Sequence, residues 1–178
     1  MIRPAHLSDL DALVRLEQRC FAGDRLSRRS FRYLLTRANA ALLVDDEHGV
    51  VRGYALLRFR AGSPRARLYS IAVDPRHHGK GAGRALLSAA EQVAGVRGAA
   101  RLQLEIRKDN HAAVRLYRGM GYREFGSYVD YYADHMDALR MQKPLPANPL
   151  PIMTPASDRE KPRTVSAGQQ QQVITRQS

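Results

Sequence analysis

The sequence predicts an α/β fold in which helices flank a mixed, largely antiparallel central sheet within a single domain. Helical and strand-like patterns of apolar residues alternate along the chain, as α/β architectures require. A strand–helix–strand–helix unit occupies the middle of the sequence, and other strand patterns lie on both sides of it. The chain has 178 residues, which is enough for one core of ordinary size and too few for two.

Two helices are predicted first. Ser8, followed three residues later by Asp11, resembles a capping box that opens a helix. A second, basic helix is expected from Arg28 to Arg37. The apolar side of the first helix is formed by Leu10, Leu13, Val14 and Phe21.

The sheet and the remaining helices follow. The first two strands are joined by the turn-prone segment Glu47-His48-Gly49, and the third ends at Asp74-Pro75. Long helical patterns cover Gly81 to Val96 and His111 to Met120. The strand patterns cover residues 40–46, 50–60, 67–73, 101–107, 122–132 and 137–143.

A change in composition marks the end of the predicted domain. From about Pro146 the chain is rich in Pro, Ser and Gln, lacks aromatic residues and has no apolar period. Such a segment buries too little apolar surface to offset the entropy lost on ordering. The domain is therefore predicted to span residues 1–145, and residues 146–178 to form a disordered tail.

The formal net charge of +12 has several readings. It is typical of a nucleic-acid binder, of a protein associated with the ribosome, or of an enzyme that attracts anionic ligands. Solvated arginines without a partner explain it equally well. The sequence has no recognisable nucleic-acid motif and only 4 Phe and 8 Tyr for base stacking, so no specific nucleic acid is predicted.

Composition also limits the compartment and the cofactors. No apolar run approaches the ~20 residues of a membrane span, and the N-terminus has no apolar signal region. Cys20 is the single cysteine, most simply a packed core residue, and no Cys/His cluster has metal-ligand spacing. We therefore expect a cytoplasmic protein without a membrane partner and without a metal.

A glycine-rich turn, DPRHHGKGAGRALL, connects the third strand to the long helix. Gly79, Gly81 and Gly83 let the backbone turn tightly and approach a ligand closely. The first turn of a helix offers unpaired N–H groups, and Lys80 and Arg84 add positive charge, so the turn is predicted to bind a pyrophosphate. The P-loop and the dinucleotide fingerprint both fit poorly. A glycine connection without a ligand remains an alternative.

The turn resembles the signature of the GCN5-related N-acetyltransferase (GNAT) superfamily, Gln/Arg-x-x-Gly-x-Gly/Ala. This resemblance implies the GNAT-type sheet, acetyl-CoA as cosubstrate, and pairing of the pantetheine arm with the strand end at Ile71, Ala72 and Val73. One departure is that His78 stands at the Gln/Arg position, where a weaker charge contact is expected. The backbone that would hold the pyrophosphate belongs to Gly79, Lys80, Gly81, Ala82, Gly83 and Arg84.

Each of three further residues can be explained by an ordinary structural role as well as by a chemical one. In RLQLEIR, Glu105 points to the sheet face opposite to the alternating apolar residues, as a solvated strand carboxylate also would. Asn110 precedes a helix and is well placed as its N-cap. Tyr117 lies on the apolar side of that helix, where a core aromatic is common.

The run from Asn110 to Tyr122, N-x-x-A-x-x-L-Y-x-x-x-G-Y, resembles the second acetyl-CoA motif of the same superfamily. Together with LEIR and DALRM it is most similar to the ribosomal-protein-alanine, or protein N-terminal, acetyltransferase branch. That resemblance covers roughly residues 2–143. It implies that Glu105 is the general base, Tyr117 the general acid, and Asn110 a coenzyme contact.

The acceptor is predicted to be a peptide or protein N-terminus. An α-amino group with a pKa of about 7.7–8.0 is roughly one quarter neutral at pH 7.4, whereas a lysine side chain is about 0.1% neutral. A single carboxylate base therefore handles an α-amine more easily, and no covalent enzyme intermediate is needed. A small-molecule amine is the second candidate acceptor, and a non-catalytic acetyl-CoA-binding or ribosome-associated module is the third reading.

Acceptor specificity is expected from the segment between the first two helices and from the hairpin before DALRM. Where the relatives commonly have Pro-Trp after Cys-Phe, this chain has CFAGDRLSRRSF, with Asp24, Arg25, Arg28 and Arg29. This departure favours an acidic peptide or a small anionic amine, although a solvated basic helix explains it as well. Tyr131 and Tyr132 are candidates to line the cleft or to serve as packing residues.

Overall fold

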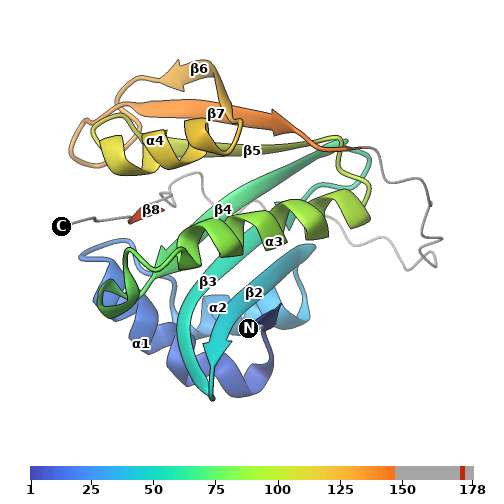
Figure 1. Cartoon of the computed structure of the whole chain (residues 1–178), viewed down its shortest axis with the longest axis vertical. Coiled ribbons are helices and arrows are strands. Elements are labelled where there is room, and N and C mark those ends of the chain that lie inside the picture. The colour runs from blue at the N-terminus through green and yellow to red at the C-terminus, as the bar shows by residue number, and fades with distance from the viewer. Residues whose placement is uncertain (147–172, 175–178) are drawn as a thin grey trace.

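One sheet organises the molecule. The computed structural model describes residues 1–146 and 173–174, and their strands lie in the order β1-β2-β3-β4-β5-β7-β6, with β8 paired to β4 (Figure 1). Every pairing is antiparallel except those of β4 with β5 and with β8, so the predicted mixed, largely antiparallel sheet is confirmed. The strands are β1 (Ile2–Pro4), β2 (Ala40–Glu47), β3 (Val50–Phe59), β4 (Arg65–Val73), β5 (Arg101–Arg107), β6 (Arg123–Tyr128), β7 (Ala138–Pro144) and β8 (Val173–Ile174).

Helices cover both faces of this sheet. On one face α3 packs across β2, β3 and β4, and α4 packs against β5, whereas α1 and α2 cover β2, β3 and β4 on the other (Figure 1). The central unit β4-α3-β5-α4 is the strand–helix–strand–helix unit predicted from the sequence. The helices are α1 (Leu10–Cys20), α2 (Arg28–Thr36), α3 (Ala82–Val96) and α4 (His111–Gly119), with 3-10 turns η1 (Leu7–Asp9) and η2 (Pro75–His77).

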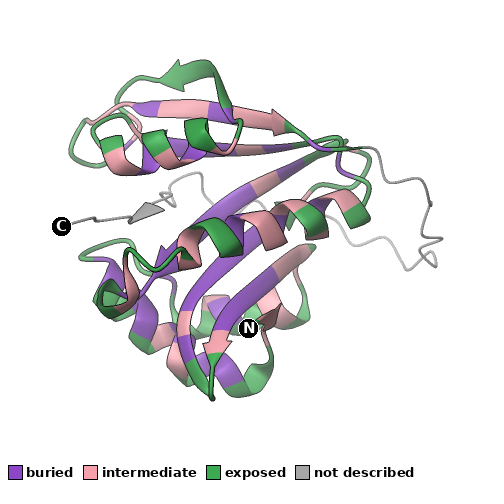
Figure 2. Cartoon of the chain, viewed as in Figure 1, coloured by how far each residue is buried: buried purple, intermediate pink, exposed green. Residues whose placement is uncertain are grey.

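The sheet divides the core into two apolar clusters. Leu86 and Leu87 of α3 and Leu104 of β5 belong to one cluster, and Leu13 and Phe31 of α1 and α2 belong to the other. Figure 2 shows that the central strands are buried along most of their length, whereas β6 is exposed throughout. Because neither face of the central strands is free, their apolar residues run almost continuously instead of alternating.

The N-terminus differs from the prediction. Ser8 does not open the first helix: it lies inside η1, and the capping contacts run from His6 N–H to Asp9 Oδ2 (2.8 Å) and from Asp9 N–H to His6 O (2.9 Å). The strand β1 was not predicted, because three residues are too short to show a period. The strand predicted over residues 122–132 is also shorter, since β6 ends at Tyr128.

The predicted disordered tail falls mostly outside the described residues. Residues 147–172 and 175–178 are not described, and the boundary of the domain at residue 145 stays a prediction. Within the predicted tail, Val173 and Ile174 form β8.

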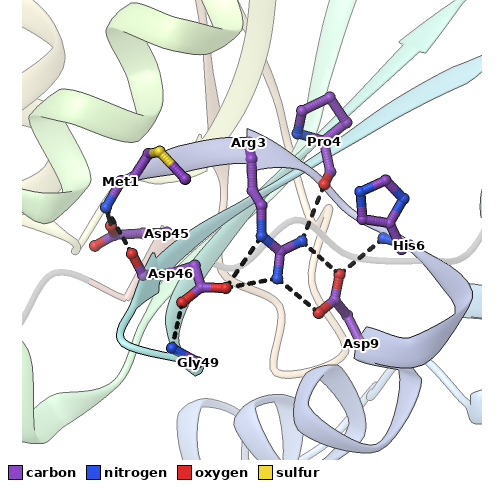
Figure 3. Close-up of polar contacts among 8 residues, drawn as sticks. All are labelled: Met1, Arg3, Pro4, His6, Asp9, Asp45, Asp46 and Gly49. Carbon is purple, nitrogen blue, oxygen red and sulfur yellow. Dashed lines mark hydrogen bonds and ion pairs between the residues drawn. The ribbon is translucent and has the colours of Figure 1, made fainter.

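A charged cluster fixes β1 to the rest of the sheet (Figure 3). The Arg3 guanidinium donates two hydrogen bonds to Asp9, at 2.8 and 2.9 Å, and two to Asp46 Oδ2, at 2.6 and 3.0 Å. These hydrogen bonds lower the pKa of both carboxyl groups. Gly49 N–H, in the β2–β3 turn, donates to Asp46 Oδ1 (2.8 Å). One arginine therefore links β1, η1 and the end of β2.

The cluster predicts how stability depends on pH. Because the folded-state pKa values of Asp9 and Asp46 lie below the unfolded value of about 3.9, their contribution is complete above that pH and is lost as pH falls through the folded values. Arg3→Gln should lower the melting temperature at pH 7 by about 2–4 °C and flatten its decrease between pH 5 and pH 3. Thermal unfolding followed by circular dichroism measures both effects. Arg15→Gln, a change of an exposed residue, is the control. The same dependence of melting temperature on pH in the natural chain and in both variants would contradict the prediction.

Candidate functional site

The glycine-rich turn between β4 and α3 is built from two left-handed residues. Gly79 has φ +73° and Gly81 has φ +77°, a conformation that side chains disfavour. A Cβ atom added at either glycine would meet nothing within 4 Å, so the backbone here faces open space. Gly81 is the N-cap of α3 and supplies no side-chain cap, which leaves the first N–H groups of that helix available to a ligand. The turn therefore has the open backbone that a phosphate group requires, and binding of a phosphate by residues 79–84 stays a prediction.

His78 is turned toward the protein. Its Nε2 atom lies 2.8 Å from the carbonyl oxygen of Val73, at the end of β4. A carbonyl oxygen only accepts hydrogen bonds, so Nε2 is the donor. The thiol of Cys20 lies 3.4 Å from the same oxygen, which confirms that Cys20 is a packed core residue. At the position where the superfamily signature has Gln or Arg, this chain thus fixes the turn to the end of β4.

The strand end that was predicted to pair with pantetheine lies where β4 separates from β5. The two strands pair only over Arg65–Arg67 and Arg101–Gln103, although both continue further. An extra residue, Tyr69, interrupts the register of β4 against β3. Ile71 and Ala72 then pair in parallel with β8. The edge of β4 at this point therefore accepts an extended backbone, and β8 uses the same residues that were assigned to the coenzyme.

Glu105 lies on β5 and is 6% exposed. Arg67 Nε donates to Glu105 Oε2 (2.9 Å), and Arg67 Nη2 donates to the hydroxyl of Tyr131 (3.2 Å). Burial alone would lower the pKa of Arg67, but the charge of Glu105 raises it overall. Leu104 on the same strand belongs to the core beneath α3 and α4, so Glu105 lies on the opposite face, as predicted. Its ion pair fixes the direction of the carboxylate.

Tyr117 lies on α4 and is fully buried, with its hydroxyl lacking any hydrogen-bond partner among the described residues. Its ring meets the edge of Tyr122 at a centroid distance of 5.4 Å. Burial, with a smaller effect from Tyr132, raises the pKa of Tyr117 well above its usual value. A buried hydroxyl without a partner is costly, so a partner supplied by a ligand would fit here.

Asn110 is the N-cap of α4. Its side-chain oxygen accepts a hydrogen bond from Ala113 N–H (3.1 Å), which confirms the ordinary reading of this residue. The contact with the coenzyme that the resemblance implied stays a prediction.

The segment between α1 and α2 is tied to β4 by a carboxylate that the sequence analysis missed. Glu17 is 3% exposed and accepts hydrogen bonds from Leu26 N–H (2.8 Å) and from the Tyr54 hydroxyl (2.7 Å). The Tyr54 hydroxyl also lies 2.8 Å from Ser70 Oγ, one residue before Ile71. Burial raises the pKa of Glu17. The available signal was a carboxylate on the apolar side of a helix, four residues after Leu13.

The basic residues of that segment are partly committed to internal contacts. Arg28 forms an ion pair with Asp11 of α1, and Arg25 Nε donates to the carbonyl oxygen of Phe21. Of the two candidate tyrosines, Tyr131 is bound to Arg67, whereas Tyr132 is 3% exposed and carries the Arg107 guanidinium over its ring. Tyr132 is therefore mainly a packing residue, and Tyr131 belongs to the surroundings of Glu105.

Two structural absences apply to the described part of the chain. Residues 1–146 and 173–174 contain no group of three or more His, Cys, Asp or Glu side chains placed to hold a metal ion. Among the same residues, every helix is too short or too polar to cross a bilayer.

Comparisons with known proteins identify the family of this chain. The model of the Acetyltransferase (GNAT) family matches residues 10–122. The N-alpha-acetyltransferase of Sulfurisphaera tokodaii is 31% identical over 155 residues, covering 81% of this chain and 92% of that protein. The ribosomal protein bS18-alanine N-acetyltransferase of Salmonella typhimurium is 34% identical over 146 residues, covering 78% and 93%.

A solved structure is similar over most of the chain. The crystal structure of the ribosomal-protein-S18-alanine N-acetyltransferase from Escherichia coli superposes with a TM-score of 0.73 at 30% identity, covering 85% of this chain and 99% of that one. Sequence and fold thus agree on the same group of enzymes. The chain belongs to the GNAT family of acetyltransferases and is an acyltransferase.

Proposed function

We propose that this chain transfers the acetyl group of acetyl-CoA directly to the N-terminal α-amine of a peptide or protein, with Glu105 as base and Tyr117 as acid. One observation carries the proposal. A buried phenol without a partner on α4 and a fixed carboxylate on β5 lie on opposite faces of the sheet, beside the point where β4 separates from β5. Acetyl transfer to an ammonium group requires both a base and an acid.

The coenzyme would be held by main-chain groups. Gly79 to Arg84 would bind the pyrophosphate at the N-terminus of α3, where the helix dipole favours negative charge. Ile71 to Val73 would pair with the pantetheine arm along the edge of β4, and a main-chain N–H there would bind the thioester oxygen. When bound, acetyl-CoA supplies a thioester that an amine can attack. Asn110 is proposed as an additional contact.

Glu105 would accept the proton of the substrate ammonium group, directly or through a water molecule. Its ion pair with Arg67 holds the carboxylate in one direction, and Tyr131 in turn holds Arg67. A base fixed in this way loses little entropy when the amine binds. The three side chains would therefore act as one unit, in which only Glu105 exchanges the proton.

Tyr117 Oη would hold the proton that the leaving sulfur requires. In water a phenol is a weaker acid than a thiol, with pKa values of about 10 and 8.5. Burial raises the pKa of Tyr117 further, so the phenol is protonated at neutral pH. It would give up its proton only as negative charge develops on the leaving sulfur.

The acceptor follows from the chemistry of the amine and from the relatives. An α-amine offers a far larger neutral fraction than lysine at neutral pH. The relatives carry names that state N-alpha-acetylation and acetylation of a ribosomal-protein alanine. A cytoplasmic location and an association with the ribosome accord with those names and stay predictions. Acetyl-CoA turnover against an unbiased peptide library, read by mass spectrometry, tests the acceptor, and acetylation of small amines alone would replace it.

Glu105→Gln should lower kcat/KM about 100-fold or more, because a general base contributes roughly 10²–10⁴. The loss should shrink above pH 8, where the α-amine is already neutral. Initial rates between pH 6.5 and 9.5 measure the effect. Glu124→Gln, a change of an exposed glutamate on β6, is the matched control. Equal losses at all pH values would remove Glu105 from the role of base.

Tyr117→Phe should lower kcat about 100-fold while leaving the melting temperature unchanged or slightly raised. The removed hydroxyl has no hydrogen-bond partner among the described residues, so its loss costs no internal contact. Tyr122→Phe is the matched control, since this ring is equally buried and touches Tyr117. Steady-state kinetics and thermal unfolding of both variants decide the matter, and full activity of Tyr117→Phe would refute the role of acid.

The proposed pantetheine position and β8 use the same edge of β4, so they should compete. Proline lacks the main-chain N–H, and Val173→Pro with Ile174→Pro would remove two donors from β8. The double variant should bind coenzyme A several-fold more tightly than the natural chain. Isothermal titration of the full-length proteins measures the affinity, with Ala167→Pro as control. Identical affinities for coenzyme A in all three proteins would show that the pantetheine arm and β8 do not compete for the edge of β4.

A further inference from the structure

The face of the sheet that carries Glu105 holds more arginines than carboxylates. Arg140 on β7 pairs directly opposite Glu105 on β5, and directly opposed residues of antiparallel strands share a face. Arg67 and Arg58 lie on the same side, since both guanidinium groups stand over the ring of Tyr69, at 5.8 and 5.4 Å from its centroid.

Only part of this positive charge is neutralised by ion pairs. Arg67 forms an ion pair with Glu105. Arg107, also on this face, forms ion pairs with Asp109 and Asp134. Within residues 1–146 and 173–174, neither Arg58 nor Arg140 forms an ion pair. The surroundings of the proposed base thus carry two guanidinium groups without a carboxylate.

Arg140 is held in place more firmly than a surface arginine. Its guanidinium carbon lies 4.5 Å from the ring centroids of both Phe125 and Tyr128, so it is sandwiched between two aromatic side chains of β6. Its Nε atom is buried and has no hydrogen-bond partner among the described residues. An arginine that is fixed by stacking and has no ion pair among the described residues is prepared to bind an anion.

We propose that Arg140 selects acceptors that carry a carboxylate near the reactive amine, such as peptides with Asp or Glu at the second residue, and that Arg58 assists from the opposite side. This inference rests on the proposed function, because it concerns the acceptor that Glu105 would deprotonate. An acidic side chain would satisfy Arg140, whereas a lysine at the same position would be repelled by both arginines.

The structure also changes which arginine is proposed to favour acidic acceptors. The sequence analysis assigned it to Arg25, Arg28 and Arg29, between the first two helices. Arg28 is bound to Asp11 and Arg25 to a carbonyl group, whereas Arg140 lies in register with the proposed base. The strand pairing, and not the basic segment, places an arginine without an ion pair among the described residues in register with the proposed base.

The test uses three peptide substrates that differ only at the second residue, which is Asp, Asn or Lys. Their kcat/KM values are measured with the natural chain and with the variants Arg140→Gln, Arg140→Glu and Arg58→Glu. The natural chain should prefer Asp over Asn and Asn over Lys by about 5-fold in kcat/KM at each step, as an incompletely buried ion pair allows. Arg140→Gln should abolish the preference and Arg140→Glu should reverse it, while KM for acetyl-CoA stays constant. Higher salt should weaken every preference.

Arg58→Glu guards against a folding defect, because Arg58 is exposed and its replacement removes only the stacking of its guanidinium over the Tyr69 ring. It should reduce the preference for Asp in the same direction. Arg15→Glu, an equal change of charge on the outer side of α1, should leave the order unchanged. Turnover of all three peptides at equal rates, or an Asp preference that survives Arg140→Glu, would overturn the inference alone. Turnover of none of them by the natural chain would overturn the proposed function as well.

Discussion

The early separation of β4 from β5 is the constraint on which the site depends. These parallel strands pair over three residues each and then diverge, because α3 holds β4 against β2 and β3 while α4 and β7 hold β5. The extra residue Tyr69 adds to the divergence, since a bulge bends the strand that carries it. The main-chain groups at Ile71 and Ala72 are thereby left to an additional extended segment, which in this structure is β8.

The two proposed catalytic side chains reach this point from opposite faces. Alternation along β5 sends Leu104 into the core under α4 and Glu105 to the other side. The apolar face of α4, packed on that core, carries Tyr117 inward. Burial on one side therefore keeps a phenol protonated, and an ion pair on the other keeps a carboxylate oriented. The sheet itself separates the acid from the base.

Buried polar contacts connect the site to the first helix. Glu17 links the segment after α1 to Tyr54 and Ser70, and the Cys20 thiol and His78 both meet the carbonyl oxygen of Val73. Such groups are costly to bury unless each finds a partner, and here they find partners on β3 and β4. The segment between α1 and α2 is thus fixed relative to the strand end, and His78 fixes the glycine-rich turn to the same strand end.

The sequence by itself determined the order of the elements, the central β4-α3-β5-α4 unit, the glycine turn, and the separation of Glu105 from its apolar neighbours, because these follow from local period and from backbone freedom. It could not reveal β1, the role of Glu17, or the arginines around Glu105. Those depend on which residues the folded sheet brings together. The strand register places Arg140 opposite Glu105, and Arg67 Nε lies 2.9 Å from Glu105 Oε2. Contacts between residues 35 or more positions apart carry no local period, so only the folded chain decides them.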